Sequence, residues 1–294
     1  MLAYYAHILC IAFAKWAPAL FAAAAGTEHG AGDAAHGGGD DGGHHDGPPH
    51  LPSLVGMLTG GHGFWYEWVN VIYAFFIAVV LCVIAVRVYA KREMIPGPFQ
   101  NAIEMIVEGF LNFFSSILGE EHGRKYTPFL GTLFIYILFM NWIGLIPLGH
   151  SPSTSWSITA SLAIIVFLYV QFIGIQKNGL IGYLDHLAGQ PRNALGWGMV
   201  ILMFPLHIIG ELAKPLSLSL RLFGNITGED VLIAVFVGLG IGMLSFINSP
   251  IGVPLQFPFI LLGLLLSTVQ ALVFALLSTI YILLMLPHEE EHEH

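Results

Sequence analysis

The sequence predicts an all-α membrane protein with about five transmembrane helices and one amphipathic helix in the membrane interface. Three observations lead to this fold class. Of the 294 residues, 56% are hydrophobic and only 10% are charged, whereas a soluble domain has about 25% charged residues. The apolar residues form segments long enough to cross the roughly 30 Å hydrocarbon core of a bilayer. Lys and Arg are concentrated in alternate connecting segments, as in multi-span proteins.

The N-terminal quarter of the chain lies outside the predicted membrane domain. Residues 1–25 are apolar and end in alanines, which is typical of a secretory signal peptide. No positive charge precedes the apolar stretch and Lys15 interrupts it, so an uncleaved anchor fits equally well. Residues 26–67 are rich in Gly, His and Asp. A segment of this composition cannot bury a core, and we expect a flexible tail.

The membrane domain is predicted to cover residues 68–287. The expected transmembrane segments are 68–90, 127–149, 157–175, 196–248 (a long, interrupted region) and 255–287. Residues 98–118 differ from these, because Glu104 and Glu108 share one helical face while aromatic residues occupy the others. This pattern predicts an amphipathic helix that lies in the interface rather than crossing the membrane.

The last two segments are too long to stand upright in a bilayer. A helix over residues 199–247 would be on the order of 70 Å long at 1.5 Å per residue, and the hydrocarbon core is about 30 Å thick. We therefore expect it to be tilted, bent or both. Pro205 and Pro215 supply the bend points. The segment at 255–287, at about 50 Å, is also longer than the core is thick.

The positions of Lys and Arg predict the orientation. Five of the ten lie between the last turn of the first segment and the start of the second (Arg87, Lys91, Arg92, Arg124 and Lys125), and two lie between the third and fourth (Lys177 and Arg192). None occurs in 26–68, 150–157 or 241–257. The positive-inside rule then places residues 26–67 outside the membrane, and the loops at 91–126 and 176–195 in the cytoplasm. Five spans put the C-terminus, with its acidic tail at 288–294, in the cytoplasm.

Arg221 is the first candidate functional residue. Only Lys15, Lys214 and Arg221 are basic residues placed within hydrophobic segments away from their ends. Placing an arginine at the centre of a span costs about 2.5–3.5 kcal/mol on insertion scales. A charge retained at this cost indicates a function.

Polar residues around Arg221 share one face of the predicted helix. Their spacing of three or four residues places them on that face: His207, Glu211, Lys214, Ser217, Arg221, Asn225 and Glu229. Such a stripe lines a water path or contacts a polar partner. An internal network would explain part of it, with Glu211 paired to Lys214 and Glu229 paired to Asn225 or Arg221. No carboxylate lies three or four residues from Arg221, so we expect its partner in another chain.

Two further features concern helix packing. Gly224 and Gly228 form a G-x-x-x-G pattern, which allows another helix to approach closely. Gln270 and Asn141 are isolated polar residues in apolar segments. We expect both side chains to form hydrogen bonds across helices.

The sequence at 215–225, PLSLSLRLFGN with Lys214 before it, resembles the characteristic motif of subunit a of the F-type ATP synthase. Four other segments resemble parts of the family in the same order: 95–109, 127–147, 157–163 and 265–282. The resemblance covers about residues 68–287.

The resemblance implies roles for the polar residues. Arg221 matches the essential arginine that faces the carboxylates of the rotating c-ring. Asn225 and Gln270 match polar residues near this arginine in the family, and Lys214 matches the basic residue two turns before it. Asp230 falls on the position of an acidic or histidine group in many members, and Glu229 is next to it. Two positions depart from the family pattern: His207 stands where many members have a glutamate, and Gly263 where some have a histidine or glutamate. The outer relay would then rest on Glu229 and Asp230.

The function implied is that of an ion-translocating stator subunit of a rotary ATP synthase, with two offset half-channels. The outer half-channel would reach Asn141, Glu229, Asp230 and Gln270. The inner half-channel would reach His207, Glu211 and Lys214. The expected partners are the c-ring, the subunit b stator, membrane lipid and either protons or sodium, with no nucleic acid. The expected location is a bacterial inner membrane.

Other functions fit the sequence less well. A self-contained secondary transporter with a buried Arg/Glu/Lys site would have inverted repeats, and no repeat is visible. An intramembrane enzyme would need a nucleophile and a base, and no such pair stands out. Residues 288–292 match the zinc motif H-E-x-x-H, but they lie at the very end of the chain, so no metal site is expected. We expect no cofactor, since the chain also lacks a phosphate-binding loop.

Overall fold

The computed structural model describes residues 68–90, 97–146, 149–187, 194–244 and 254–286. The predicted signal peptide or anchor, the tail at 26–67 and the acidic tail at 288–294 lie outside these residues. The described part is helical and contains no strands. Its helices are α4 (Val69–Ala90), α5 (Pro98–Leu118), α6 (Glu120–Leu145), the short 3-10 helix η1 (Pro152–Thr154), α7 (Trp156–Leu187), α8 (Ala194–Leu244) and α9 (Phe257–Met285).

Five of these helices are long and apolar enough to cross a membrane: α4, α6, α7, α8 and α9. The predicted all-α fold class is therefore confirmed. Helix α5 is amphipathic, as predicted. The apolar residues Phe114 and Leu118 are buried, whereas the polar residues Glu108 and Asn112 are exposed.

Helix α6 begins seven residues earlier than predicted, at Glu120 rather than at 127. The charged start of this segment hides it from a hydropathy pattern. Glu120 and Glu121 in the first turn suit the positive end of the helix dipole. Gly119 alone connects α5 to α6, with φ 81° and ψ 164°, a conformation that is essentially restricted to glycine.

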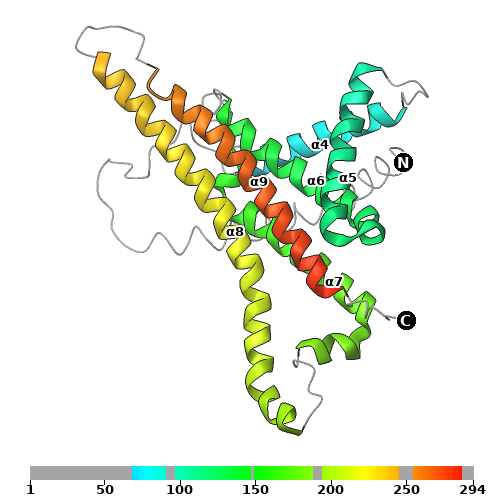
Figure 1. Ribbon diagram of the computed structural model, residues 1–294. Coiled ribbons are helices and arrows are strands. Elements are labelled where there is room, and N and C mark those ends of the chain that lie inside the picture. Colours follow the sequence, from blue (N-terminus) through cyan, green and yellow to red (C-terminus); the bar gives the residue numbers. More distant parts are fainter. Residues whose placement is uncertain (1–67, 91–96, 147–148, 188–193, 245–253, 287–294) are drawn as a thin grey trace, which may run out of the picture.

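Helix α7 continues to Leu187, well past the predicted end at 175, but it changes direction at Gly179 (Figure 1). Gly179 has φ 70° and ψ 167°, which is not a helical conformation. The kink begins a second short helical segment within the predicted loop at 176–195.

Replacing Gly179 by alanine should destabilise the protein by about 1–3 kcal/mol, because only glycine adopts this backbone conformation without strain. Gly182→Ala is the matched control, since Gly182 lies in regular helix and the nearest atom to an added Cβ is Asn178 Cβ at 3.5 Å. The midpoint of thermal unfolding of the purified complex measures the difference. Equal midpoints for the two variants would contradict the prediction.

Helix α8 is continuous over 51 residues, so the polar residues that interrupt the apolar pattern of this segment do not interrupt the helix. Pro205 and Pro215 both lie inside it. Proline removes a backbone hydrogen bond and crowds the preceding turn, which bends a helix without necessarily ending it. Figure 1 shows α8 bending along its length and running beside α9 in its upper half.

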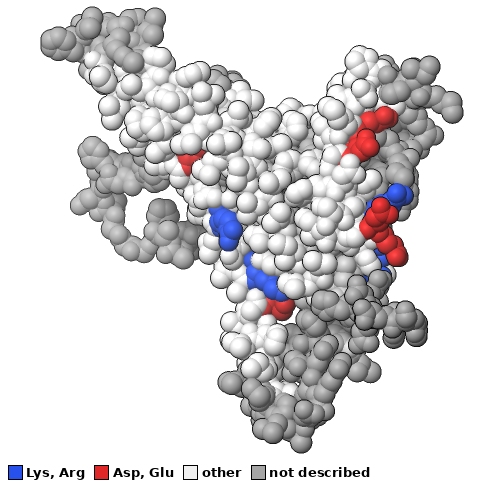
Figure 2. Space-filling view, in the orientation of Figure 1, with Lys and Arg blue, Asp and Glu red and all other residues white. Residues whose placement is uncertain are grey.

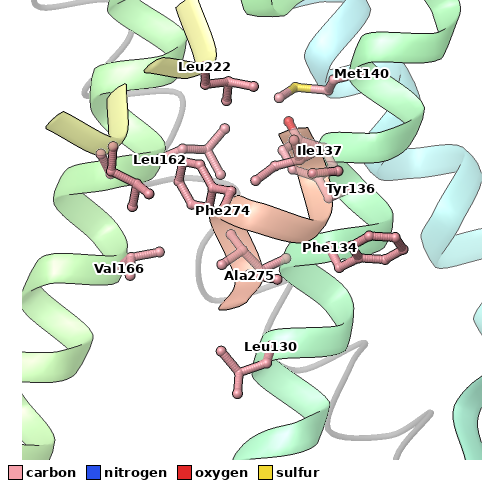
Figure 3. Close-up of a cluster of buried hydrophobic side chains, with 14 of the residues drawn as sticks. Leu130, Phe134, Tyr136, Ile137, Met140, Leu162, Val166, Leu222, Phe274 and Ala275 are labelled. Atoms are coloured by element: carbon pink, nitrogen blue, oxygen red, sulfur yellow. The ribbon is translucent and has the colours of Figure 1, made fainter. Parts of the chain in front are cut away.

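The hydrophobic core lies where α6, α7, α8 and α9 meet (Figure 3). Phe274 of α9 is fully buried at its centre, surrounded by Ile137 and Met140 of α6 and by Leu162 of α7. Helix α8 contributes the buried residues Leu218, Leu222 and Ile226. Because this face of α8 is fixed against the core, its opposite face points away from the rest of the protein.

Candidate functional site

Arg221 lies on the outward face of α8. It is exposed and forms no hydrogen bond or ion pair within the described part of the chain. Gly224 and Gly228 are exposed on the same side, and a Cβ added to either would meet no atom within 4 Å. None of the helices that the structure describes covers this surface. Figure 2 shows basic side chains along the middle of α8, with acidic side chains at both ends of the row.

Asn225 and Gln270 join α8 to α9 one turn further along. Asn225 Nδ2 donates a hydrogen bond to Gln270 Oε1 at 2.7 Å. Gln270 is 3% exposed, and its Nε2 has no partner within the described residues. The expected hydrogen bond of Gln270 across helices is present, and one buried donor remains free to bind a further acceptor.

Glu229 turns away from the exposed face into the interface between α8 and α9. It is buried, and its Oε2 accepts a hydrogen bond from Ser267 Oγ at 3.0 Å. Its carboxylate lies directly against Gly263, where an added Cβ would be 2.7 Å from the Glu229 carboxyl carbon. The sequence-based alternatives, which paired Glu229 with Asn225 or Arg221, are wrong. Glu229 fills the space that a side chain at position 263 would need.

Asn141 extends this polar cluster to α6 and η1. It is 2% exposed; Ser153 Oγ donates to its Oδ1 at 2.7 Å, and its Nδ2 donates to the Ser267 carbonyl at 3.3 Å. A buried chain of polar groups thus leads from η1 through Asn141 and Ser267 to Glu229. Asp230 follows Glu229 in α8 and is half-buried.

Sequence reasoning missed the two serines of this chain. Ser267 lies three residues before Gln270 and four after Gly263, a spacing that places all three on one face of a helix. That face was a usable signal for Ser267. Ser153 lies in a connecting segment, and no periodicity marks it.

A second polar cluster lies on the other side of Arg221. Lys214 forms an ion pair with Glu211 Oε1, and Gln171 Nε2 of α7 donates to Glu211 Oε2 at 3.1 Å. The Lys214 ammonium also lies 5.3 Å from the centre of the Tyr281 ring. The internal pair of Glu211 with Lys214 is therefore present. His207 is exposed, and its Nδ1 lies 3.0 Å from the carbonyl of Met203.

Arg221 thus lies between two polar clusters of α8. It is seven residues from Lys214 and eight from Glu229, which correspond to about 10 and 12 Å along the helix. Polar side chains on both sides of a fixed cation on an exposed helix can deliver an ion to a partner surface on one side of the cation and remove it on the other. The fold and this site define a multi-span helical membrane protein with an uncovered cationic surface.

Comparison with known proteins gives a consistent result. Residues 71–283 match the family described as ATP synthase A chain. The ATP synthase subunit a of Protochlamydia amoebophila is 48% identical over 249 residues, covering 83% of this chain and 92% of the relative. Those of Oleidesulfovibrio alaskensis and Helicobacter hepaticus are 40% and 34% identical, covering 80% and 82% of this chain and 95% and 98% of the relatives.

The chain belongs to the family of ATP synthase subunit a. Membership in this family implies a proton-translocating subunit of the membrane sector that supports ATP synthesis. It also implies a complex with the ring of c subunits and the other subunits.

Proposed function

We propose that the outward face of α8 contacts the c-ring and that Arg221 is the fixed positive charge between two offset half-channels. The observation that carries this proposal is the exposure of Arg221, which has no hydrogen bond or ion pair within the described residues. The open space over Gly224 and Gly228 supports it, because small residues allow a neighbouring helix to come close.

The outer half-channel reaches Asn141, Glu229, Asp230 and Gln270. The buried hydrogen-bonded chain through Ser153, Asn141 and Ser267 to Glu229 supports this path. A proton that arrives here neutralises a carboxylate of the ring. The neutral carboxyl group can then move into lipid, because the cost of removing its charge from water no longer applies.

The inner half-channel reaches His207, Glu211 and Lys214. After rotation, the ring carboxyl group loses its proton to this path. Arginine stays protonated in proteins, so Arg221 cannot relay the proton and separates the two paths. It also attracts the carboxylate as it ionises, which favours proton release. The membrane potential supplies about 2.3 kcal/mol per charge per 100 mV.

The same proposal includes the surroundings of the subunit. The distribution of Lys and Arg supports an orientation with the N-terminal tail outside and the C-terminus in the cytoplasm. The bacterial origin of the relatives supports a bacterial inner membrane, and membership in the family supports subunit b as the stator partner. A sodium-dependence assay of ATP hydrolysis distinguishes protons from sodium as the transported ion. The rival reading, a self-contained transporter, would have its cation enclosed within the chain rather than exposed on the outer surface.

Disulfide cross-linking tests the ring contact. In a chain with both native cysteines replaced by serine, Gly224→Cys should cross-link to a cysteine placed beside the carboxylate of a c subunit. The control is Phe76→Cys, because Phe76 is 56% exposed on α4, which does not border the outward face of α8. A cross-link from Phe76→Cys of equal yield, or none from Gly224→Cys in the assembled complex, would contradict the proposed contact.

A further inference from the structure

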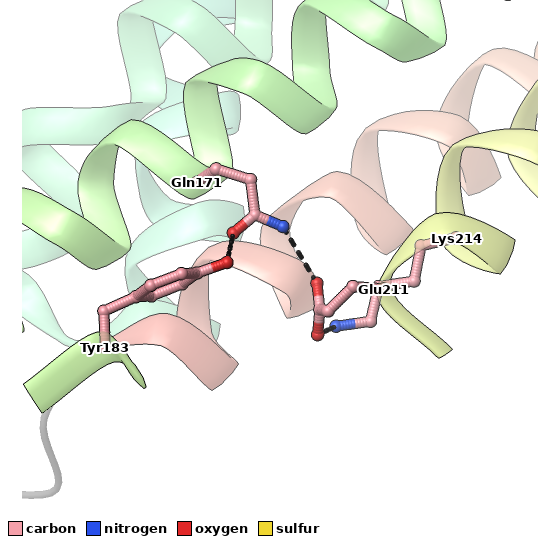
Figure 4. Close-up of polar contacts among 4 residues, drawn as sticks. All are labelled: Gln171, Tyr183, Glu211 and Lys214. Carbon is pink, nitrogen blue, oxygen red and sulfur yellow. Dashed lines mark hydrogen bonds and ion pairs between the residues drawn. The ribbon is translucent and has the colours of Figure 1, made fainter. Parts of the chain in front are cut away.

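Gln171 lies within the apolar span of α7, and both ends of its amide are hydrogen-bonded (Figure 4). Tyr183 Oη donates to Gln171 Oε1 at 2.6 Å. Gln171 Nε2 donates to Glu211 Oε2 at 3.1 Å, and Lys214 occupies the other oxygen of the same carboxylate. Neither Gln171 nor Tyr183 belongs to the polar face of α8, and the half-channels described above do not use them.

The donor and the acceptor in each of these hydrogen bonds follow from the chemistry of the groups. An ionised Glu211 accepts hydrogen bonds only, so it requires the NH2 end of the Gln171 amide. The carbonyl end then faces Tyr183 and requires a donor. Burial, together with the negative charge of Glu211, raises the pKa of Tyr183 above its usual range. The phenol therefore stays protonated and donates a hydrogen bond to the amide oxygen.

The backbone of α7 places Tyr183 for this contact. The change of direction at Gly179 brings Tyr183 back alongside α7, twelve residues after Gln171. Gly174 lies against the Tyr183 ring, and a Cβ added there would be 3.4 Å from the ring carbon Cδ2. The position of the phenol is thus fixed by two glycines on the same helix.

The charges on α8 show what this arrangement does. Lys214 and Arg221 are two cations on the same helix, about 10 Å apart. Lys214 is compensated by Glu211, whereas Arg221 has no ion pair within the described residues. If the pair opened, the ring carboxylate would meet a second free cation on the side of the inner half-channel. A carboxylate held there would leave more slowly.

We propose that Gln171 and Tyr183 are positioning residues that hold the Glu211–Lys214 pair closed, so that Arg221 is the uncompensated cation the ring carboxylate meets on the described part of α8. This inference rests on the proposed function and adds that the two cations of α8 differ in role: Arg221 meets the ring carboxylate, whereas Lys214 is neutralised by Glu211. The closed pair lines the inner half-channel as a neutral unit.

ATP-driven proton pumping by membrane vesicles that contain the complete complex tests the inference. Glu211→Gln should reduce the pumping rate about tenfold, the size expected when a hydrogen-bonded charge is lost. Gln171→Leu should reduce it about threefold and Tyr183→Phe about twofold, because each removes one neutral link. Gln100→Leu is the matched control, since Gln100 Nε2 donates a similar hydrogen bond to Glu104 on α5, at 2.9 Å, and its loss should leave the rate within about 20% of the native value.

The decisive measurement repeats the Gln171→Leu change in a protein that lacks both charges of the Glu211–Lys214 pair. The Glu211→Gln/Lys214→Gln double variant should pump faster than Glu211→Gln alone, because it lacks the free cation. Adding Gln171→Leu to it should have no further effect. If Gln171→Leu still reduced the rate threefold in this background, Gln171 would have a packing role and the inference would be overturned. A double variant that pumps no faster than Glu211→Gln would also overturn it, because the free Lys214 cation would then not slow pumping. Coupled pumping by Arg221→Ala would instead overturn the proposed function itself, so the two failures are distinguishable.

Discussion

Replacing Arg221 by alanine should abolish ATP-driven proton pumping in membrane vesicles while the complex still assembles. The side chain is exposed on α8, and the described residues of the chain offer it no ion pair. Its loss should therefore leave the packing of Leu218 and Leu222 against the core unchanged. The ring carboxyl group would then ionise without a fixed positive charge beside it, so its ionisation would be less favourable. We expect the rate to fall by about a hundredfold or more, as when a preorganised electrostatic group is removed.

A second measurement separates the two roles proposed for this arginine. If Arg221 also blocks direct passage between the half-channels, vesicles with Arg221→Ala should dissipate an imposed proton gradient faster than native vesicles. Leu239→Ala is the control, because Leu239 is a 51% exposed residue on α8 far from the charged positions, and both rates should stay at native values. Normal coupled pumping by the Arg221→Ala variant would rule out the proposed role.

The sequence predicted the features that depend on one segment at a time. The apolar segments gave the spans, and a spacing of three or four residues placed Arg221, Asn225 and Lys214 together on α8. The pairing of Glu211 with Lys214 was also predictable, since both lie on one helix. Each of these follows from the geometry of a single helix.

The features that sequence reasoning missed depend on two helical segments meeting. Glu229 has the spacing of the exposed face, yet it is buried because Gly263, on another helix, leaves room for its carboxylate. The contact of Tyr183 with Gln171 requires the change of direction at Gly179. A glycine shows in a sequence that a side chain is absent, but the sequence does not show which neighbour occupies the space.

The space over Gly263 leads to the second large effect. Gly263→Ala should slow proton pumping by roughly tenfold, because the added Cβ would lie 2.7 Å from the Glu229 carboxyl carbon and overpacking at such a contact costs about 1–3 kcal/mol. The carboxylate would have to leave its hydrogen bond with Ser267. Gly109→Ala is the matched control, since a Cβ added at Gly109 meets no atom within 4 Å, and its pumping rate should stay native.

Exchanging the two residues distinguishes the position of the carboxylate from simple crowding. Gly263→Glu alone should be at least as damaging as Gly263→Ala, because two carboxylates would then compete for one buried space. Combined with Glu229→Gly, it returns a single carboxylate to the interface from the opposite helix and vacates the space it needs. The double variant should pump faster than either single variant. If it were no better than Gly263→Glu, the carboxylate would have to be attached to α8, and the outer half-channel would depend on the backbone position of Glu229 as well as on its charge.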